Sequence, residues 1–350
     1  GLKKGGSYVS IWLVRAGGSG EYENKFLEEG RIYVTWDDFD CNLRQLASPE
    51  ELRVALSEQY PEAKAGTVKN WASQIWPFAK RMKIGDWVVL PSKKKASIHF
   101  AKITGDYQHI PSGPSPFFHV RSVDWFAQDI PRSNFDQDIL YSFGAFMTIC
   151  QITRNDAESR IKRMAQLNWK ASSRLAPLDS DITDSIDQAS SLDIERFAKD
   201  QMAKFISAKF SGHGMVRLVE AILKAKGFLT YRAPAGPDKG VDLLAAGGTL
   251  GFESPKICVQ VKSGETPVDR PTLDQLIGAM QNFGAESGLL VSWAGFKGSV
   301  DKELPAQFFR VRLWDQDALI DELLECYDML GEELRAELPF KRVWAIADSE

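Results

Sequence analysis

Short apolar-rich segments separated by turn residues recur through the first 150 positions, a pattern typical of strands. Five segments carry it, each bounded by Gly, Asp or Pro: 8–15, 31–36, 86–90, 97–103 and 119–125. Three segments have helical spacing or caps: 21–29, which ends at Gly30, a segment that begins at Ser48-Pro49, and 67–82. We therefore expect a small curled sheet or barrel covered by a few helices.

Beyond residue 191 helices and strands alternate, which predicts an α/β domain with helices on both sides of its sheet. The expected helices are 192–209, 212–226, 272–282, 297–304 and 316–329, and the expected strands are 228–232, 240–245, 256–262, 287–291 and 309–313. A helix over 155–167 precedes a Ser- and Asp-rich stretch without apolar periodicity, which indicates a linker. We divide the chain into a first domain (1–167), a linker (168–191), a second domain (192–330) and a C-terminal extension (331–350).

Composition narrows the class of protein. The 350 residues are 44% hydrophobic and carry a net charge of −4, which excludes a protein that coats nucleic acid by bulk charge but allows a basic cleft. No apolar run approaches the ~20 residues of a membrane span, and the first six residues lack the apolar segment of a signal peptide, so we expect a cytoplasmic protein. The four cysteines are widely separated, which predicts reduced and mostly buried thiols.

The most informative polar residues stand at the start of one expected strand and the end of the next. Asp242 follows a Pro-Asp-Lys-Gly turn, and Gln260 and Lys262 share one face of the later strand. If the two strands align, a carboxylate, an amide oxygen and a neighbouring main-chain carbonyl meet at one corner suited to hydrated Mg²⁺. A lysine ammonium beside it can hold the attacking water and help to deprotonate it, which predicts phosphodiester hydrolysis.

Two further carboxylates are candidates for the same site. Glu220 lies at the edge of the apolar stripe of the helix before these strands, from which it can reach the metal or its water shell. Asp238 is an alternative metal ligand to Asp242, although a turn of this kind favours Asp for backbone reasons.

The segment from about 212 to 314 resembles the catalytic domain of Mrr-type restriction endonucleases, within the PD-(D/E)XK nuclease superfamily. The resemblance is carried by the helix that ends in Lys-Gly-Phe, the Gly-Pro-Asp-Lys-Gly-Val-Asp turn and the Gln-Val-Lys strand. It implies a restriction-endonuclease-like fold with a mixed central sheet, and a phage-defence enzyme that cuts double-stranded DNA with Mg²⁺, for which Mn²⁺ substitutes. It also implies that Asp242, Gln260, Lys262 and Glu220 are catalytic and that all of these except Lys262 bind the metal. Gln260 replaces the superfamily's second acid, as is normal in the Mrr branch, so we expect weaker or more substrate-assisted metal binding.

Six of the ten tryptophans fall in the first domain. Lys69-Asn70-Trp71 and the run from Met82 through Gly85-Asp86 to Ser92 resemble the EVE and YTH branch of PUA-like barrels. This resemblance implies a PUA-like β-barrel with helices, in which an aromatic pocket holds a modified or flipped base. The candidate pocket residues are Trp36, Asn70, Trp71 and Ser92. The alternative is that these tryptophans belong to the core, each with a satisfied N–H.

A glycine-rich run and a lysine run are each expected to lie in a turn of the first domain. Gly17-Gly18-Ser19-Gly20 lacks the Lys-Ser/Thr that a phosphate loop requires, so we interpret it as a plain turn. Lys93-Lys94-Lys95 is typical of a solvated hairpin tip, with contact to a phosphate backbone as the alternative.

Together these features predict a modified-cytosine reader, for 5-methylcytosine or 5-hydroxymethylcytosine, joined to an Mrr-like nuclease. Because one site cuts one strand, we expect a homodimer or an oligomer assembled on DNA. Two alternatives stay open: a nuclease whose first domain senses a nucleotide signal, and a non-catalytic nucleic-acid-binding module. The presence of Asp242, Gln260 and Lys262 together disfavours the second.

Overall fold

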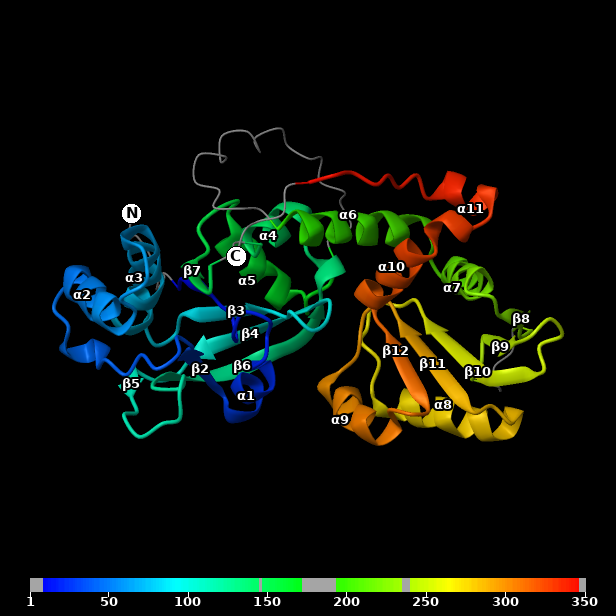
Figure 1. Ribbon diagram of the computed structural model, residues 1–350, viewed down its shortest axis with the longest axis horizontal. Helices are drawn as coiled ribbons and strands as arrows, with labels where there is room; N and C mark the ends of the chain where they lie inside the picture. Colours follow the sequence, from blue (N-terminus) through cyan, green and yellow to red (C-terminus); the bar gives the residue numbers. More distant parts are fainter. Residues whose placement is uncertain (1–8, 145–146, 172–192, 235–239, 346–350) are drawn as a thin grey trace, which may run out of the picture. The chain divides into compact units, whose positions relative to one another are not determined.

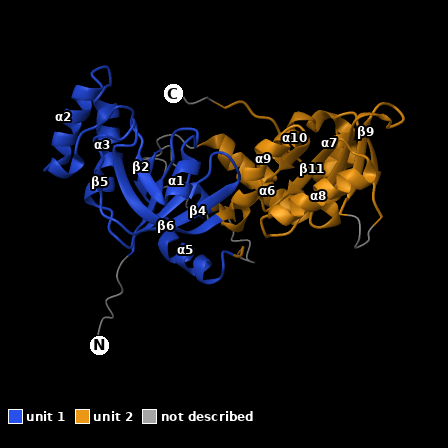
Figure 2. Cartoon of the chain, turned by 90° about the horizontal axis from the view of Figure 1, so that it is seen from below, with its two compact units in different colours: residues 1–128, 138–169 blue, residues 129–137, 170–350 orange. Residues whose placement is uncertain are grey.

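The computed structural model describes residues 9–144, 147–171, 193–234 and 240–345. The chain divides into two compact units (Figure 2). Unit 1 comprises residues 1–128 and 138–169, and unit 2 comprises residues 129–137 and 170–350. The segment 129–137, which the sequence pattern grouped with the first domain, therefore belongs to unit 2.

Unit 1 is built on a curled seven-stranded sheet (Figure 1). Its strands run in the order β2 (Arg31–Val34), β6 (His119–Pro131), β4 (Ser97–Ile103), β3 (Trp87–Pro91), β1 (Ile11–Val14) and β7 (Ile149–Gln151), and β5 (Gln108–His109) pairs with β6. β1 is parallel to β3, while β7, β4, β2 and β5 pair antiparallel with their neighbours. The expectation of a curled sheet is confirmed, and the PUA-like assignment stays a prediction.

Unit 1 also contains helices, and the first three bury apolar residues in the core of the sheet. They are α1 (Glu23–Glu29), α2 (Pro49–Gln59), α3 (Ala65–Lys80), α4 (Gln137–Ser142), which begins at the unit boundary, and α5 (Ala157–Gln166). In α3, Val68, Ala72, Ile75 and Phe78 are buried at helical spacing and join the core of the sheet. The Ser48 hydroxyl caps α2 by accepting a hydrogen bond from the N–H of Glu51 at 3.3 Å, as the sequence predicted.

Unit 2 contains a five-stranded mixed sheet. The order is β12 (Val311–Trp314), β11 (Ser287–Ser292), β10 (Glu253–Lys262), β9 (Leu243–Gly247) and β8 (Leu229–Arg232). β10, β11 and β12 are parallel, while β8, β9 and β10 are antiparallel. This topology fits a restriction-endonuclease-like fold and confirms the predicted α/β domain.

Helices cover both faces of the unit 2 sheet (Figure 1). One face packs against α6 (Ile194–Lys209), α7 (His213–Ala225) and α10 (Gln316–Glu325), and the other against α8 (Arg270–Phe283) and α9 (Gly298–Gln307). In β10, Val259 and Val261 join the first cluster, whereas Cys258 joins the second. Three residues of β10 were predicted to form a polar face: Cys258, Gln260 and Lys262. Cys258 is buried beneath α8 and Gln260 is also buried, so of the three only Lys262 is exposed to solvent.

The core of unit 2 includes residues outside the range 192–330 that the sequence pattern predicted for the second domain. Leu334 in α11 (Glu332–Glu337) and Leu338 after it are buried in the α7 cluster, so the chain beyond residue 330 contributes to this core. The Arg132 guanidinium and the Asp200 carboxylate form a buried bidentate ion pair, with N–O distances of 2.9 and 2.7 Å.

Within the described ranges, none of the helices combines the length and apolar character that a membrane span requires.

Candidate functional sites

Asp242 lies against the end of β10. Its main-chain N–H donates to the carbonyl of Val259 at 2.8 Å, and its carboxylate Oδ2 accepts a hydrogen bond from the N–H of Val261 at 2.7 Å. The amide of Val261 follows Gln260 directly in the chain, so the carboxylate is held beside the Gln260–Lys262 stretch. The structure thus brings together three of the predicted site residues, Asp242, Gln260 and Lys262.

Gln260 contributes a buried oxygen to this corner. Its side chain is 4% exposed, and its Oε1 has no hydrogen-bond partner among the described residues. Leaving such an acceptor unsatisfied costs about 1–3 kcal/mol, so a native protein normally supplies it with water, an ion or a ligand. Lys262, two residues later on the same face of the strand, is exposed and keeps its ammonium within reach of solvent.

Glu220 is engaged elsewhere. Its carboxylate accepts hydrogen bonds from Thr230 Oγ1 at 3.0 Å and from Arg232, both in β8, and forms an ion pair with Lys224 at 3.3 Å. Burial raises the pKa of Glu220, but the hydrogen bonds from Arg232, Thr230 and Lys224 outweigh it and hold the pKa below its usual value. The structure thus shows Glu220 held by β8 and Lys224, and its role as a metal ligand stays a prediction.

The donor set at the end of β10 fits a hydrated Mg²⁺. Among the described residues, no group of three His, Cys, Asp or Glu side chains could hold a metal ion, and Asp238 lies outside the described residues. Mg²⁺ keeps several of its waters and is commonly bound through only one or two carboxylates. One carboxylate and the orphaned oxygen of Gln260 meet that requirement, whereas zinc sites are built largely from Cys and His side chains.

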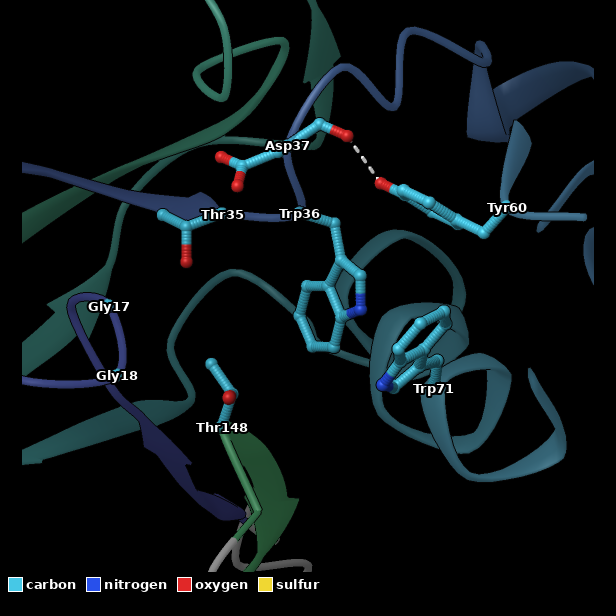
Figure 3. Close-up of a pocket in the computed structure, with 8 residues that line it drawn as sticks. All are labelled: Gly17, Gly18, Thr35, Trp36, Asp37, Tyr60, Trp71 and Thr148. Carbon is cyan, nitrogen blue, oxygen red and sulfur yellow. Dashed lines mark hydrogen bonds between the residues drawn. The ribbon is translucent and has the colours of Figure 1, made fainter. Parts of the chain in front are cut away.

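Unit 1 contains an aromatic pocket of about 290 Å³ (Figure 3). It is lined by Gly17, Gly18, Thr35, Trp36, Asp37, Tyr60, Trp71 and Thr148. Trp36 follows β2 and Trp71 lies in α3, and Figure 3 places both indoles on one side of the pocket, near Tyr60. Two of the four predicted base-pocket residues are thus brought together.

Asn70 and Ser92 do not line this pocket. Asn70 precedes Trp71 in α3, and a helix turns about 100° per residue, so its side chain leaves in another direction and accepts a hydrogen bond from Gln74 Nε2 at 2.7 Å. Ser92 is buried after β3, where its hydroxyl donates to Glu23 Oε2 at 2.8 Å. Both side chains thus have partners within the protein, and their roles in base binding stay predictions.

Tyr60 and Asp37 complete the pocket, although the sequence pattern did not single them out. The Tyr60 hydroxyl donates to the main-chain carbonyl of Asp37, and its ring meets the Trp71 indole edge-on, with centroids 5.2 Å apart (Figure 3). Burial, helped by the nearby charges of Asp37 and Asp38, raises the pKa of Tyr60 to about 12, so this hydroxyl is neutral at ordinary pH. In the sequence, the Thr-Trp-Asp-Asp run that follows β2 is the feature that could have pointed to this side of the pocket.

Other tryptophans of unit 1 follow the core alternative. Trp12 is buried and donates its Nε1–H to Asp86 at 3.0 Å, and Trp125 donates its Nε1–H to the carbonyl of Phe26 at 2.8 Å. Both N–H groups are satisfied inside the protein, as expected of buried indoles. Trp12 and Trp125 thus belong to the core and its edge, whereas Trp36 and Trp71 line the pocket.

Comparison with known families separates the two units. Residues 207–323 match the family described as restriction endonuclease (Mrr_cat), and residues 12–149 match a family described as a domain of unknown function (DUF8426). Unit 2 therefore carries a restriction endonuclease catalytic domain, as the sequence motifs indicated.

Two solved structures show weak overall likeness to the chain. One is the DNA modification-dependent restriction endonuclease AspBHI, at 13% identity and a TM-score of 0.32, covering 73% of this chain and 67% of that one. The other is the MspJI restriction endonuclease in complex with a 27-mer oligonucleotide, at 13% identity and a TM-score of 0.29, covering 93% of this chain and 71% of that one. No curated protein matches the chain.

Proposed function

We propose that this protein is a Mg²⁺-dependent, restriction-type DNA endonuclease of the Mrr kind that cuts at sites selected by unit 1. The observation that carries the proposal is the Asp242 carboxylate, hydrogen-bonded to the Val261 amide beside the orphaned, buried Oε1 of Gln260. The restriction endonuclease match over 207–323 supports it, because it covers all three residues.

Asp242 and Gln260 would hold the metal, and Mn²⁺ should replace Mg²⁺ because both prefer oxygen ligands. A bound metal of this kind supplies positive charge to the phosphoryl oxygens and lowers the pKa of a coordinated water. Lys262 would hold the attacking water and offset the charge that builds up on the phosphate, which its exposure at the end of β10 permits.

The aromatic pocket of unit 1 would bind one base taken out of the duplex. Its volume of about 290 Å³ lies just below the ~300–1,000 Å³ typical of small-ligand sites, so it suits a single base. Stacking on Trp36 or Trp71 would contribute about 1–3 kcal/mol. The Asp37 carboxylate can accept a hydrogen bond from an exocyclic amino group, which cytosine offers and thymine lacks. We therefore propose 5-methylcytosine or 5-hydroxymethylcytosine as the ligand.

Cutting both strands needs two copies of the site, so the active form should be a homodimer or a pair assembled on DNA. Sedimentation with and without target DNA tests this, and a species that stays monomeric while it cuts both strands would refute it.

Cleavage assays on matched duplexes test the function as a whole. Unmodified, 5-methylcytosine and 5-hydroxymethylcytosine duplexes are incubated with Mg²⁺ and with wild type, Lys262→Ala or the matched control Lys256→Ala, an exposed lysine of the same strand. We expect one modified duplex to be cut, by wild type and Lys256→Ala only. Equal cutting of all three duplexes would remove the reader and keep the nuclease, and binding without cutting would leave a binding module.

Trp71→Ala tests the pocket separately. Losing one stacking surface should weaken binding of the modified duplex about 5- to 150-fold, the equivalent of ~1–3 kcal/mol, and leave binding of the unmodified duplex unchanged. If free nucleotides, rather than modified DNA, raise the melting temperature of wild type and not of Trp71→Ala, the pocket senses a nucleotide signal instead.

A further inference from the structure

The turn between β3 and β4 carries three consecutive lysines at its tip. Lys93 and Lys94 are exposed, and Lys95 is half-buried. We propose that this lysine hairpin (residues 92–96) binds the phosphate backbone of DNA beside the aromatic pocket, and that the buried carboxylate of Glu23 positions it. The proposal rests on the proposed function, since it names how the reading unit grips its substrate.

Glu23 fixes the conformation of the hairpin. Its side chain comes from the first turn of α1 and is 4% exposed. Oε1 accepts the main-chain N–H of Lys93 at 2.6 Å, and Oε2 accepts the hydroxyl of Ser92 at 2.8 Å. The Ser92 hydroxyl in turn accepts the N–H groups of Lys94 and Lys95, both at 3.1 Å. All three lysine N–H groups are therefore tied to one small network, which orders the tip before any ligand arrives.

Burial destabilises the charged form of a carboxylate, so an ordinary surface turn is not expected to be anchored by one. Burial raises the pKa of Glu23, against the hydrogen bonds from Lys93 and Ser92 and the charges of Lys94 and Lys95, which lower it. A solvated hairpin tip needs no such anchor, because water satisfies its N–H groups at no cost. An ordered tip loses less conformational entropy when it grips a ligand, which is the advantage of pre-organisation.

The hairpin lies against the glycine loop that borders the pocket. Gly20 has a φ of +76°, and a Cβ atom there would come within 2.9 Å of the Lys93 Cβ and 2.6 Å of Glu23 Oε1. Only a residue without a side chain allows this approach. Gly17 and Gly18 of the same loop line the aromatic pocket. The hairpin therefore packs against the same glycine loop that lines the pocket, since Gly20 contacts Lys93 and Gly18 borders the pocket.

This placement matches what a flipped nucleotide requires. When a base enters a pocket, its own phosphate and those next to it stay near the rim, where cations can contact them. Lys93, Lys94 and Lys95 bring three positively charged side chains to one turn of a chain whose overall charge is −4. Attraction to DNA must then come from local basic surface rather than from net charge.

Salt dependence of DNA binding tests the proposal. The affinity of the full chain for a duplex with one 5-methylcytosine and for its unmodified match is measured without Mg²⁺ over a range of KCl concentrations. The test variant replaces Lys93, Lys94 and Lys95 by Gln. The control variant makes the same charge change at exposed lysines elsewhere in unit 1, namely Lys64, Lys83 and Lys102.

Each lost phosphate contact should flatten the slope of log affinity against log salt by about 0.9, so the hairpin variant should lose about 2–3 units of slope. Its preference for the modified duplex should persist because the pocket is intact. An unchanged slope, or an equal loss in the control variant, would overturn the proposal. If wild type itself shows no preference between the duplexes, the base-reading function fails instead, so the two failures are distinguishable.

Glu23→Gln tests the positioning role, because it keeps every lysine and removes the carboxylate. Gln can still accept the N–H of Lys93 through its oxygen, but its amide nitrogen cannot accept the Ser92 hydroxyl. We expect Glu23→Gln to bind both duplexes more weakly while a thermal melt shows that the fold is retained. Glu23→Asp should not restore the affinity, because its shorter side chain cannot reach both the Ser92 hydroxyl and the Lys93 N–H. Binding equal to wild type would show that Glu23 does not position the hairpin.

Discussion

Replacing Asp242 by Asn separates the chemical role of this residue from its structural role. The N–H of Val261 donates to the carboxylate at 2.7 Å, and Val261 is buried. Asn keeps an oxygen for that hydrogen bond and loses only the charge, so the free energy of unfolding should fall by no more than about 1 kcal/mol. Asp242→Ala leaves the N–H without its acceptor, and it should cost about 1–3 kcal/mol.

Cleavage should respond differently. Asp242 and Gln260 are the two proposed metal ligands, and the Gln260 amide is neutral, so removing the charge of Asp242 leaves a neutral donor set at this corner. Both variants should then lose at least about 10²-fold in rate, as expected for a missing electrostatic contact in the transition state. The assay is single-turnover cleavage with Mg²⁺, with urea unfolding of the same samples. Glu265→Gln, which removes an exposed charge just beyond the strand, is the matched control. Cleavage by Asp242→Asn within a few-fold of wild type would refute the assignment.

Three predictions concern stability. Burial lowers the pKa of His119 to about 4 from about 6.5 in the unfolded chain, so its stabilising effect is complete above pH 6.5 and is lost as the pH falls towards 4, by up to about 3 kcal/mol. Urea unfolding at several pH values measures this, and an equally steep profile in His119→Gln would contradict it. Asp200→Ala leaves the buried Arg132 unpaired and should cost about 3–5 kcal/mol, whereas a loss below 1 kcal/mol would mean that solvent reaches the pair. Gly288→Ala would place a Cβ 2.7 Å from Met280 Sδ, so calorimetry should show a loss of about 1–3 kcal/mol unless Met280 moves aside.

Local sequence patterns determined most helices and strands of both units. Hydrophobic spacing reports which side of a segment is buried, and caps such as Ser48 and turn glycines such as Gly30 report where a segment begins or ends. The short β5 and β7 were missed, because strands of two or three residues carry too little pattern to stand out. The sequence placed Asp242 beside Gln260 only on the condition that their strands align, and the pairing of β9 with β10 meets that condition.

Tertiary structure decided which polar residues share a site. Helix α7 packs on the face of Val259 and Val261, so Glu220 meets β8 rather than Gln260, and no property of α7 alone specifies that choice. The aromatic pocket likewise joins Trp36, Tyr60 and Trp71 with residues 17, 18 and 148, which long-range packing brings together. The sequence by itself determined the segments and their buried faces, because those depend on neighbours a few residues apart. Only the folded chain determined the pocket, since its walls come from segments more than 130 residues apart.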